Sequence, residues 1–123
     1  MSFLRSTMDV GLTPPIEYHP GTSVVLGEAL TMTAGALAKC AATAKPDYIA
    51  VGPSKEGVAP VIKVQDYMIF EVPLSAAGTS LKVGNKVTIG ADAQTVTATT
   101  ENGVATIVAI DGTAVGDIVK VRF

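Results

Sequence analysis

The chain has 123 residues and a formal net charge of −2, a size that suits one domain with its own hydrophobic core. Hydrophobic residues make up 48% of the sequence but aromatic residues only 5%, and Trp is absent, so aromatic platforms for stacking sugars or bases are scarce. The Lys and Arg residues are dispersed from Arg5 to Arg122, and without a basic cluster we expect no binding to nucleic acid.

Two further features bear on the compartment of the protein. Cys40 is the single cysteine, so we expect neither an internal disulfide nor a cysteine-based metal site. The segment MSFLRSTMDV lacks the apolar run of a signal peptide, and the longest uncharged runs, such as residues 29–38, are too short to cross a bilayer. We therefore expect a protein made in a cytoplasm, with no membrane partner.

Residues 1–22 have no sustained hydrophobic period and contain Pro14, Pro15 and Pro20. Proline fixes φ and removes a backbone donor, so the segment TPPIEYHPG is predicted to be extended, and neither a helix nor a central strand. Two interpretations remain open, an extended N-terminal arm with its own role or a disordered leader. We divide the chain into this arm and a β domain that covers residues 23–123.

From Ser23 onward, frequent glycines and β-branched residues predict many short strands. Several segments alternate between apolar and polar residues, which is typical of antiparallel strands with one face in water. In the last segment, Val119, Val121 and Phe123 are expected to face inward. The strand candidates, in chain order, are SVVLGEALTM, DYIAVG, APVIKV, YMIFEV, LKVGNKVTIG, QTVTATT, VATIVAI and DIVKVRF.

Helix and turn signals complete the predicted fold. The alanines of LTMTAGALAKCAATAK allow at most one short helix, near residues 36–44, because Gly35 and several threonines interrupt the pattern. Asn102-Gly103 is a strong β-hairpin signal, and Asp111-Gly112 is a second turn of the same chemistry. The prediction is all-β: a small β-barrel or sandwich of short antiparallel strands with an extended N-terminal arm.

One phrase, Val-Gly-(Asn/Asp)-x-Val-x-(Ile/Val), occurs twice, at residues 83–89 and 115–121. In each copy we expect the first valine to pack inward, the glycine to take a positive φ, and the Asn or Asp to bond the local backbone. The phrase is therefore predicted to be a turn followed by a strand, with chance similarity as the alternative. In the first copy, one face of the strand would carry Leu81, Val83, Val87 and Ile89.

Residues that could carry chemistry lack the partners they need. His19, the single histidine, lies in the irregular arm, and no spacing suggests a nucleophile or an orienting group for it. Ser54 in GPSKEG misses the G-x-S-x-G pattern by one residue, and Cys40 suits a buried apolar position. Asp111 and Asp117 could ligate a cation, but turn chemistry accounts for both. We therefore expect no enzyme, no cofactor and no metal site.

Several short phrases in the β domain occur in a suggestive order. GEALTM leads into AGAL, followed by YIAVG, VIKV, LKVGNKVTI and GVA, and the chain closes on GDIVKVRF. Over residues 23–123 this order resembles the small Gly/Ala/Val-rich capsid decoration (cement) proteins of tailed bacteriophages. In that family, phrases of the type IAVG and VGDxV and a closing V-x-V-R-hydrophobic recur through a β domain.

The resemblance implies a structural virion protein that binds the outer surface of a phage capsid and stabilises contacts between capsomers. It also implies a homo-oligomer, with a trimer favoured, and an arm at residues 2–20 that docks on the major capsid protein. The alternative is a receptor- or carbohydrate-binding β domain of a phage fibre or surface protein, which the scarcity of aromatic residues disfavours. The expected capsid-contact residues are Pro14, Pro15, Ile16, Tyr18 and His19.

Overall fold

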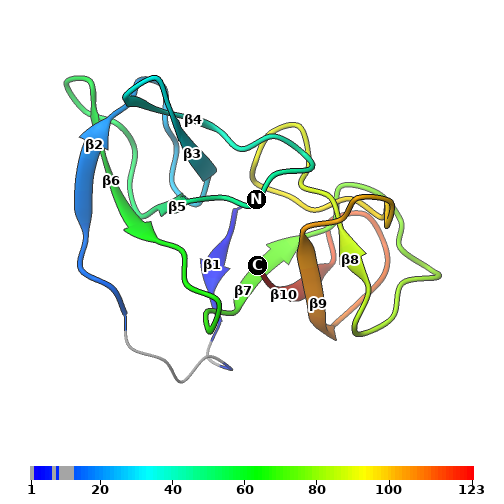
Figure 1. Ribbon diagram of the computed structural model, residues 1–123. Helices are drawn as coiled ribbons and strands as arrows, with labels where there is room; N and C mark the ends of the chain where they lie inside the picture. Colours follow the sequence, from blue (N-terminus) through cyan, green and yellow to red (C-terminus); the bar gives the residue numbers. More distant parts are fainter. Residues whose placement is uncertain (1, 7, 9–12) are drawn as a thin grey trace.

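The computed structural model describes residues 2–6, 8 and 13–123, and its strands form two antiparallel sheets that are not closed into barrels (Figure 1). The described residues contain no helix, and so none that could cross a membrane, and the predicted all-β fold is confirmed. Sheet A consists, in spatial order, of β1 (Leu4–Arg5), β7 (Phe70–Pro73), β10 (Ile118–Arg122), β9 (Ala105–Ile110) and β8 (Lys86–Val87). Sheet B consists of β2 (Glu17–Pro20), β6 (Val58–Lys63), β5 (Tyr48–Ala50), β3 (Ala29–Thr33) and β4 (Ala36–Lys39).

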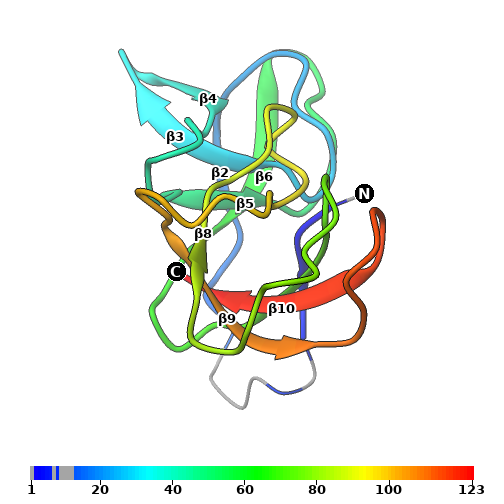
Figure 2. The same cartoon turned by 90° about the vertical axis from the view of Figure 1, so that its right-hand side faces the viewer.

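The main hydrophobic core lies between the two sheets, which are stacked one above the other in Figure 2. Along β10, Val119 and Val121 are fully buried whereas Lys120 and Arg122 are not, so the predicted alternation is confirmed. Each fully buried Val, Ile or Phe side chain contributes about 1.5 to 3 kcal/mol to stability. The core residues from the strands of sheet A include Phe70, Val72, Ile107, Val119 and Val121, and those from sheet B include Ala29, Ile49 and Ile62.

Sheet B is apolar on its other face as well. There a second buried group, the sheet B cluster, consists of Val24, Leu30, Leu37, Ala50, Ala59 and Val61. The sheet curls around this cluster, because its edge strands β2 and β4 approach each other. Directly after β2, a Cβ atom added to Gly21 would lie only 3.1 Å from Cβ of Leu37, so the curl favours a glycine there.

The N-terminal segment contributes one strand to each sheet. β1 pairs with β7 in sheet A, and β2 pairs with β6 in sheet B. Phe3 is 2% exposed, and its ring centroid lies 6.3 Å from that of Phe70 and 5.5 Å from that of Phe123. Its N–H donates to the carbonyl of Gly27 at 2.9 Å, which ties β1 to sheet B. The boundary at residue 22 stays a prediction, but the described residues before it share core and hydrogen bonds with the β domain.

The phrase that occurs twice in the sequence forms the same turn twice. In the first copy the N–H of Lys82 donates to Oδ1 of Asn85 at 2.9 Å, and the N–H of Asn85 donates to the carbonyl of Lys82 at 3.0 Å. In the second, Ala114 and Asp117 make the equivalent bonds at 3.1 and 3.0 Å. The glycine of each turn has a positive φ, 96° and 87°. The predicted turn is therefore confirmed in both copies.

The predicted inward packing of the two turn valines is wrong. Val83 is 64% exposed and Val115 is 62% exposed, because each lies within its turn and not on a strand. Leu81, Val87 and Ile89 are buried as expected. The phrase thus builds a turn that presents an apolar side chain to solvent.

Three segments also take a different structure from the predicted one. Residues 36–39 of the predicted short helix form β4, because the two-residue turn Ala34-Gly35, with φ of 52° and 81°, returns the chain beside β3. QTVTATT forms no strand and is held mainly by isolated bridges from Val96 to Leu74 and Ile89. Asn102-Gly103 makes a turn, but it lies within the long connection between β8 and β9 and closes no hairpin of its own.

Candidate partner-binding surface

The five residues expected to contact a partner differ in exposure. Ile16 is 54% exposed and Tyr18 is 68% exposed, whereas Pro15 is exposed and Pro14 half-buried. Tyr18 lies on β2 opposite Pro60 of β6, and its side chain points away from the sheet B cluster. His19 is the next residue of the strand, so its side chain points to the other face of the sheet.

A hollow of about 510 Å³ lies beside Tyr18, on the face of sheet B opposite to the sheet B cluster. The pairing of β2 with β6, the two strands at the left of Figure 1, brings its lining residues together. Its rim includes the tight turn Glu56-Gly57, closed by two reciprocal backbone bonds between Lys55 and Val58 at 2.8 and 3.2 Å. The residues that line it, called here the Tyr18 surface, are Tyr18, Pro53, Lys55, Glu56, Val58 and Pro60.

The backbone of β2 adds two polar groups beside this hollow. The carbonyl of Pro60 accepts a hydrogen bond from the N–H of Val51 at 3.0 Å, so the backbone of Pro60 points toward β5 and away from β2. Tyr18 and Pro60 are therefore a pair of opposed residues that do not hydrogen-bond to each other, and in such a pair the N–H and C=O groups of each residue point away from the other strand. The N–H and C=O of Tyr18 thus point to the open edge of the sheet. Pro20 has no N–H to offer there. A partner strand that pairs with β2 would therefore find one backbone N–H donor, that of Tyr18. Because one donor gives little main-chain pairing, binding at this edge relies on side chains.

His19 does not belong to the Tyr18 surface. Its Nε2 lies 2.9 Å from Oε1 of Glu17, and its ring centroid lies 5.0 Å from that of Tyr48. Tyr48 packs against the sheet B cluster, and burial, followed by the charges of Glu17 and Asp47, raises the pKa of its hydroxyl. His19 thus lines the inside of the curl of sheet B, where Tyr18 does not reach.

The nucleophile candidates have structural partners. Oγ of Ser54 accepts a hydrogen bond from the N–H of Val24 at 3.0 Å, which fixes the loop before β3. Cys40 is buried, and its Sγ donates to the carbonyl of Ala44 at 3.0 Å. Burial, with a smaller effect of Asp47, raises the pKa of this thiol to about 11, so it is protonated at neutral pH.

The acidic residues do not gather around a common point in the part of the chain that the structure describes. Within residues 2–6, 8 and 13–123, no three His, Cys, Asp or Glu side chains are close enough together to hold a metal ion. Asp117 uses its carboxylate in the turn described above. Oδ1 of Asp92 accepts bonds from the N–H of Gln94 and Oγ1 of Thr95, both at 2.9 Å, which stabilises another turn.

No protein-family model matches this chain, and no curated protein matches its sequence. The geometry of the surfaces therefore carries the functional argument.

Sequence reasoning found Tyr18 but missed the residues that surround it. Pro53, Lys55 and Glu56 belong to GPSKEG, whose sequence signal is an incomplete nucleophile motif. Pro60 inside an apolar run is not a signal for the hollow, because proline in a strand usually indicates an edge strand, whereas β6 lies between β2 and β5. The register that brings residue 60 opposite residue 18 is not visible in the sequence.

Proposed function

We propose that this protein is a capsid decoration protein of a tailed bacteriophage, made in the host cytoplasm and bound to the capsid exterior, where it stabilises contacts between capsomers. The observation that carries this proposal is the Tyr18 surface, an exposed apolar hollow on the edge of a rigid β scaffold. The resemblance of residues 23–123 to the decoration proteins supplies the partner class, the major capsid protein.

The composition of the Tyr18 surface supports a protein partner. Interface centres are enriched in tyrosine and other residues with large apolar area, and Tyr18 projects beside a floor of Pro53, Val58 and Pro60. Lys55 and Glu56 at the rim supply both charge signs, which suits polar contacts around an apolar centre.

The scaffold behind this surface supports a structural role. β6 pairs with β2 on one side and with β5 on the other, so the floor of the hollow is held by a continuous ladder. Ala59 and Val61, which flank Pro60 on β6, are fully buried in the sheet B cluster. A surface held in this way loses little conformational entropy when it binds.

Capsid attachment does not require a tight single site. A capsid presents the same site many times, and an oligomeric decoration protein engages several sites at once, so effective concentration raises the overall affinity. The single main-chain donor at the edge of β2 is therefore compatible with attachment through side chains of modest individual affinity.

Cosedimentation with capsids tests the proposal. Expanded capsids are assembled from the major capsid protein encoded in the same genome as this chain, mixed with micromolar protein and pelleted. We expect the wild-type protein in the pellet and, because exposed tyrosines are typical interface hot spots, at least about tenfold weaker binding for Tyr18→Ala. Tyr67→Ala removes another exposed tyrosine, outside the hollow, and should bind as the wild type does. Wild-type protein that stays in the supernatant would contradict the proposal.

The second candidate, a receptor- or carbohydrate-binding domain, is favoured by one feature. Tyr18 is 68% exposed beside an open hollow, and a sugar ring can stack on such a side chain. A glycan array separates the two functions, because binding that is lost in Tyr18→Ala, together with no sedimentation on capsids, would support the carbohydrate function.

A further inference from the structure

The outer face of sheet A, turned away from the main core, carries a regular arrangement of side chains. In one row across the sheet, Leu4 of β1 pairs with Glu71 of β7, which pairs with Lys120 of β10, and Lys120 pairs with Ala109 of β9. Two residues further along the same strands, Pro73 of β7 pairs with Ile118 of β10. Directly opposed residues share a face of the sheet, so these six side chains form one surface.

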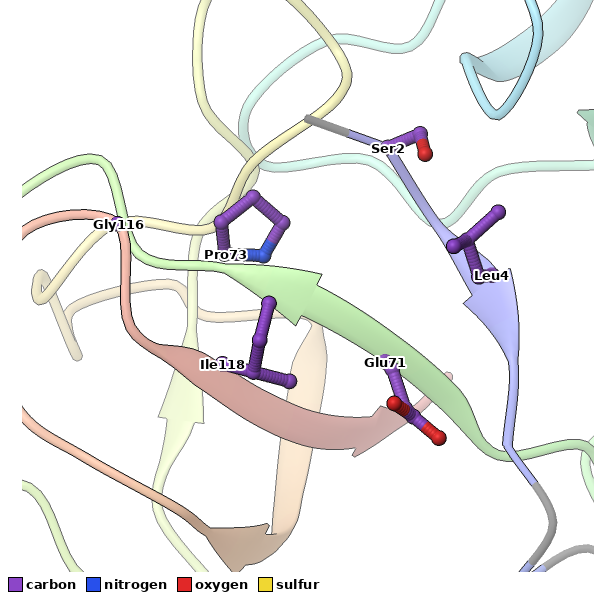
Figure 3. Close-up of a pocket in the computed structure, with 6 residues that line it drawn as sticks. All are labelled: Ser2, Leu4, Glu71, Pro73, Gly116 and Ile118. Atoms are coloured by element: carbon purple, nitrogen blue, oxygen red, sulfur yellow. The ribbon is translucent and has the colours of Figure 1, made fainter.

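This face has a hollow. The hollow, of about 260 Å³, lies over β7, with Leu4 and Ser2 on one side and Ile118 and Gly116 on the other (Figure 3). Leu4 is 52% exposed and Ile118 is half-buried, whereas Pro73 of β7, the strand between them, is buried. A second molecule with a row of side chains at the spacing of a β-strand fits such a hollow.

Two charged side chains on the face, Glu71 and Lys120, have no ion-pair partner among the described residues. Glu71 and Lys120 lie directly opposite each other on neighbouring strands and are both partly exposed. In the part of the chain that the structure describes, neither carboxylate nor ammonium has an ion-pair partner within 4.0 Å. Two further bases, Arg122 of β10 and Lys86 of β8, lie on the same face, in the row of Thr106. The face therefore offers one acid, Glu71, directly beside one of its three bases, Lys120.

We propose that this face is a twofold interface between two copies of the chain. The axis runs parallel to the strands, between β7 and β10, and lies in the plane between the two faces. The rotation places β7 of each copy over β10 of the other, so Glu71 faces Lys120 of the second copy, and this contact occurs twice. The same rotation places Pro73 over Ile118, and the hollow over β7 receives the side chains of β10.

The outermost strands fit the same rotation. β1 of each copy lies over β9 of the other, so the exposed side chain of Leu4 meets Ala109, a small residue that leaves room for it. Two sheets related in this way have nearly aligned strands, the usual arrangement for sheets packed face to face. A twofold axis across the strands would instead place Glu71 on Glu71 and Lys120 on Lys120, so charge complementarity selects the axis along the strands.

Charge reversal in separate copies tests this interface. Glu71→Lys alone places two lysines against each other at both contacts, and Lys120→Glu alone places two glutamates against each other. We expect each variant to dimerise at least about tenfold more weakly than the wild type, because like charges that face each other across an interface oppose association. An equimolar mixture of the two variants matches every contact again and should form a heterodimer. Rescue by mixing cannot arise within one chain, so it separates an interface from a role in folding.

The measurement is sedimentation equilibrium, with circular dichroism to confirm that each variant is folded. The face spans four strands about 4.8 Å apart, a small interface, so the concentration series extends to roughly 1 mM. Lys63→Glu, a charge reversal on an exposed residue of sheet B, is the matched control and should dimerise as the wild type does. A monomeric wild type, a trimer insensitive to both reversals, or a mixture that stays monomeric would each overturn the proposal. None of these outcomes depends on whether the protein binds capsids.

Discussion

The two sheets of this protein are stabilised in different ways. Strands of sheet A bury one face against the main core and leave the other face to solvent, whereas sheet B has buried apolar residues on both faces. Sheet A therefore depends on its contact with sheet B, and sheet B has a cluster of its own inside its curl. The outer face of sheet A and the edge of sheet B at Tyr18 are therefore available to partners.

The connections of the two sheets differ as well. In sheet A, the turns at residues 82–85 and 114–117 use a glycine at positive φ and an Asn or Asp side chain that accepts a backbone bond. In sheet B, the two-residue turns Ala34-Gly35 and Glu56-Gly57 place a residue other than glycine at positive φ. These two turns of sheet A are thus stabilised by side chains, whereas the two turns of sheet B retain backbone strain, as does the connection between β8 and β9 at Ala93, with a φ of 57°.

The largest effect is expected where the two sheets meet. Phe3→Ala removes a ring that packs on Phe70 and Phe123 and leaves a cavity in the main core, so we expect a loss of about 3 to 5 kcal/mol in the free energy of unfolding. Urea denaturation followed by circular dichroism measures it. The neighbouring Leu4→Ala, at an exposed position, should change the stability of the monomer by less than about 1 kcal/mol. Equal losses for the two variants would contradict the shared core.

A smaller loss is expected inside sheet B alone. Leu30 is fully buried in the sheet B cluster, and Leu30→Ala should lower the free energy of unfolding by about 2 to 4 kcal/mol. Amide hydrogen exchange in that variant should accelerate more in β3, β5 and β6 than in β9 and β10. Leu26→Ala, at a position that is 52% exposed, is the control. Uniform acceleration of exchange across both sheets would show that the sheet B cluster does not stabilise sheet B independently of sheet A.

Much of the fold could be predicted from the sequence, because alternation and β-branched residues mark most strands. β9 and β10 lie within the segments VATIVAI and DIVKVRF, with a difference of one or two residues at their ends. β4 was missed because alanine favours helices in isolation, while pairing with β3 after Ala34-Gly35 decides the outcome in the fold. β1 and β2 were missed because proline and the lack of alternation hide short strands that pair far along the chain.

The candidate surfaces were less predictable than the fold. Tyr18 was identified from an extended, proline-rich segment, but its neighbours Pro53 and Pro60 come from a different part of the sequence and meet it only through the register of β2 with β6. The outer face of sheet A depends on the register of β7 with β10 in the same way. Long-range register follows from the packing of the whole core, and no local pattern contains it.

A modest effect is expected when the turns of sheet A lose their side-chain bonds. Asn85→Ala and Asp117→Ala each remove one bond to a backbone N–H, and each should lower the free energy of unfolding by about 0.5 to 1.5 kcal/mol. The two turns contain different residues and share no bond, so the losses should add in the double variant. Val83→Ala, in the same turn as Asn85 but exposed, is the control. If it costs as much as Asn85→Ala, the side-chain bond is not what stabilises the turn.

The smallest expected effect is a gain, in the strained turns of sheet B. Ala34 has a φ of 52°, in the left-handed region that is unfavourable for alanine but tolerated by asparagine, and Gly35 follows it in a two-residue hairpin. Ala34→Asn creates the preferred Asn-Gly turn and should raise the free energy of unfolding by about 0.5 to 1 kcal/mol. Ala38→Asn introduces the same side chain at an exposed position of β4 and should give no gain, because asparagine is disfavoured in strands. A gain in both variants would mean that asparagine stabilises the hairpin through its polarity alone, and that relief of the backbone strain at residue 34 is not the cause.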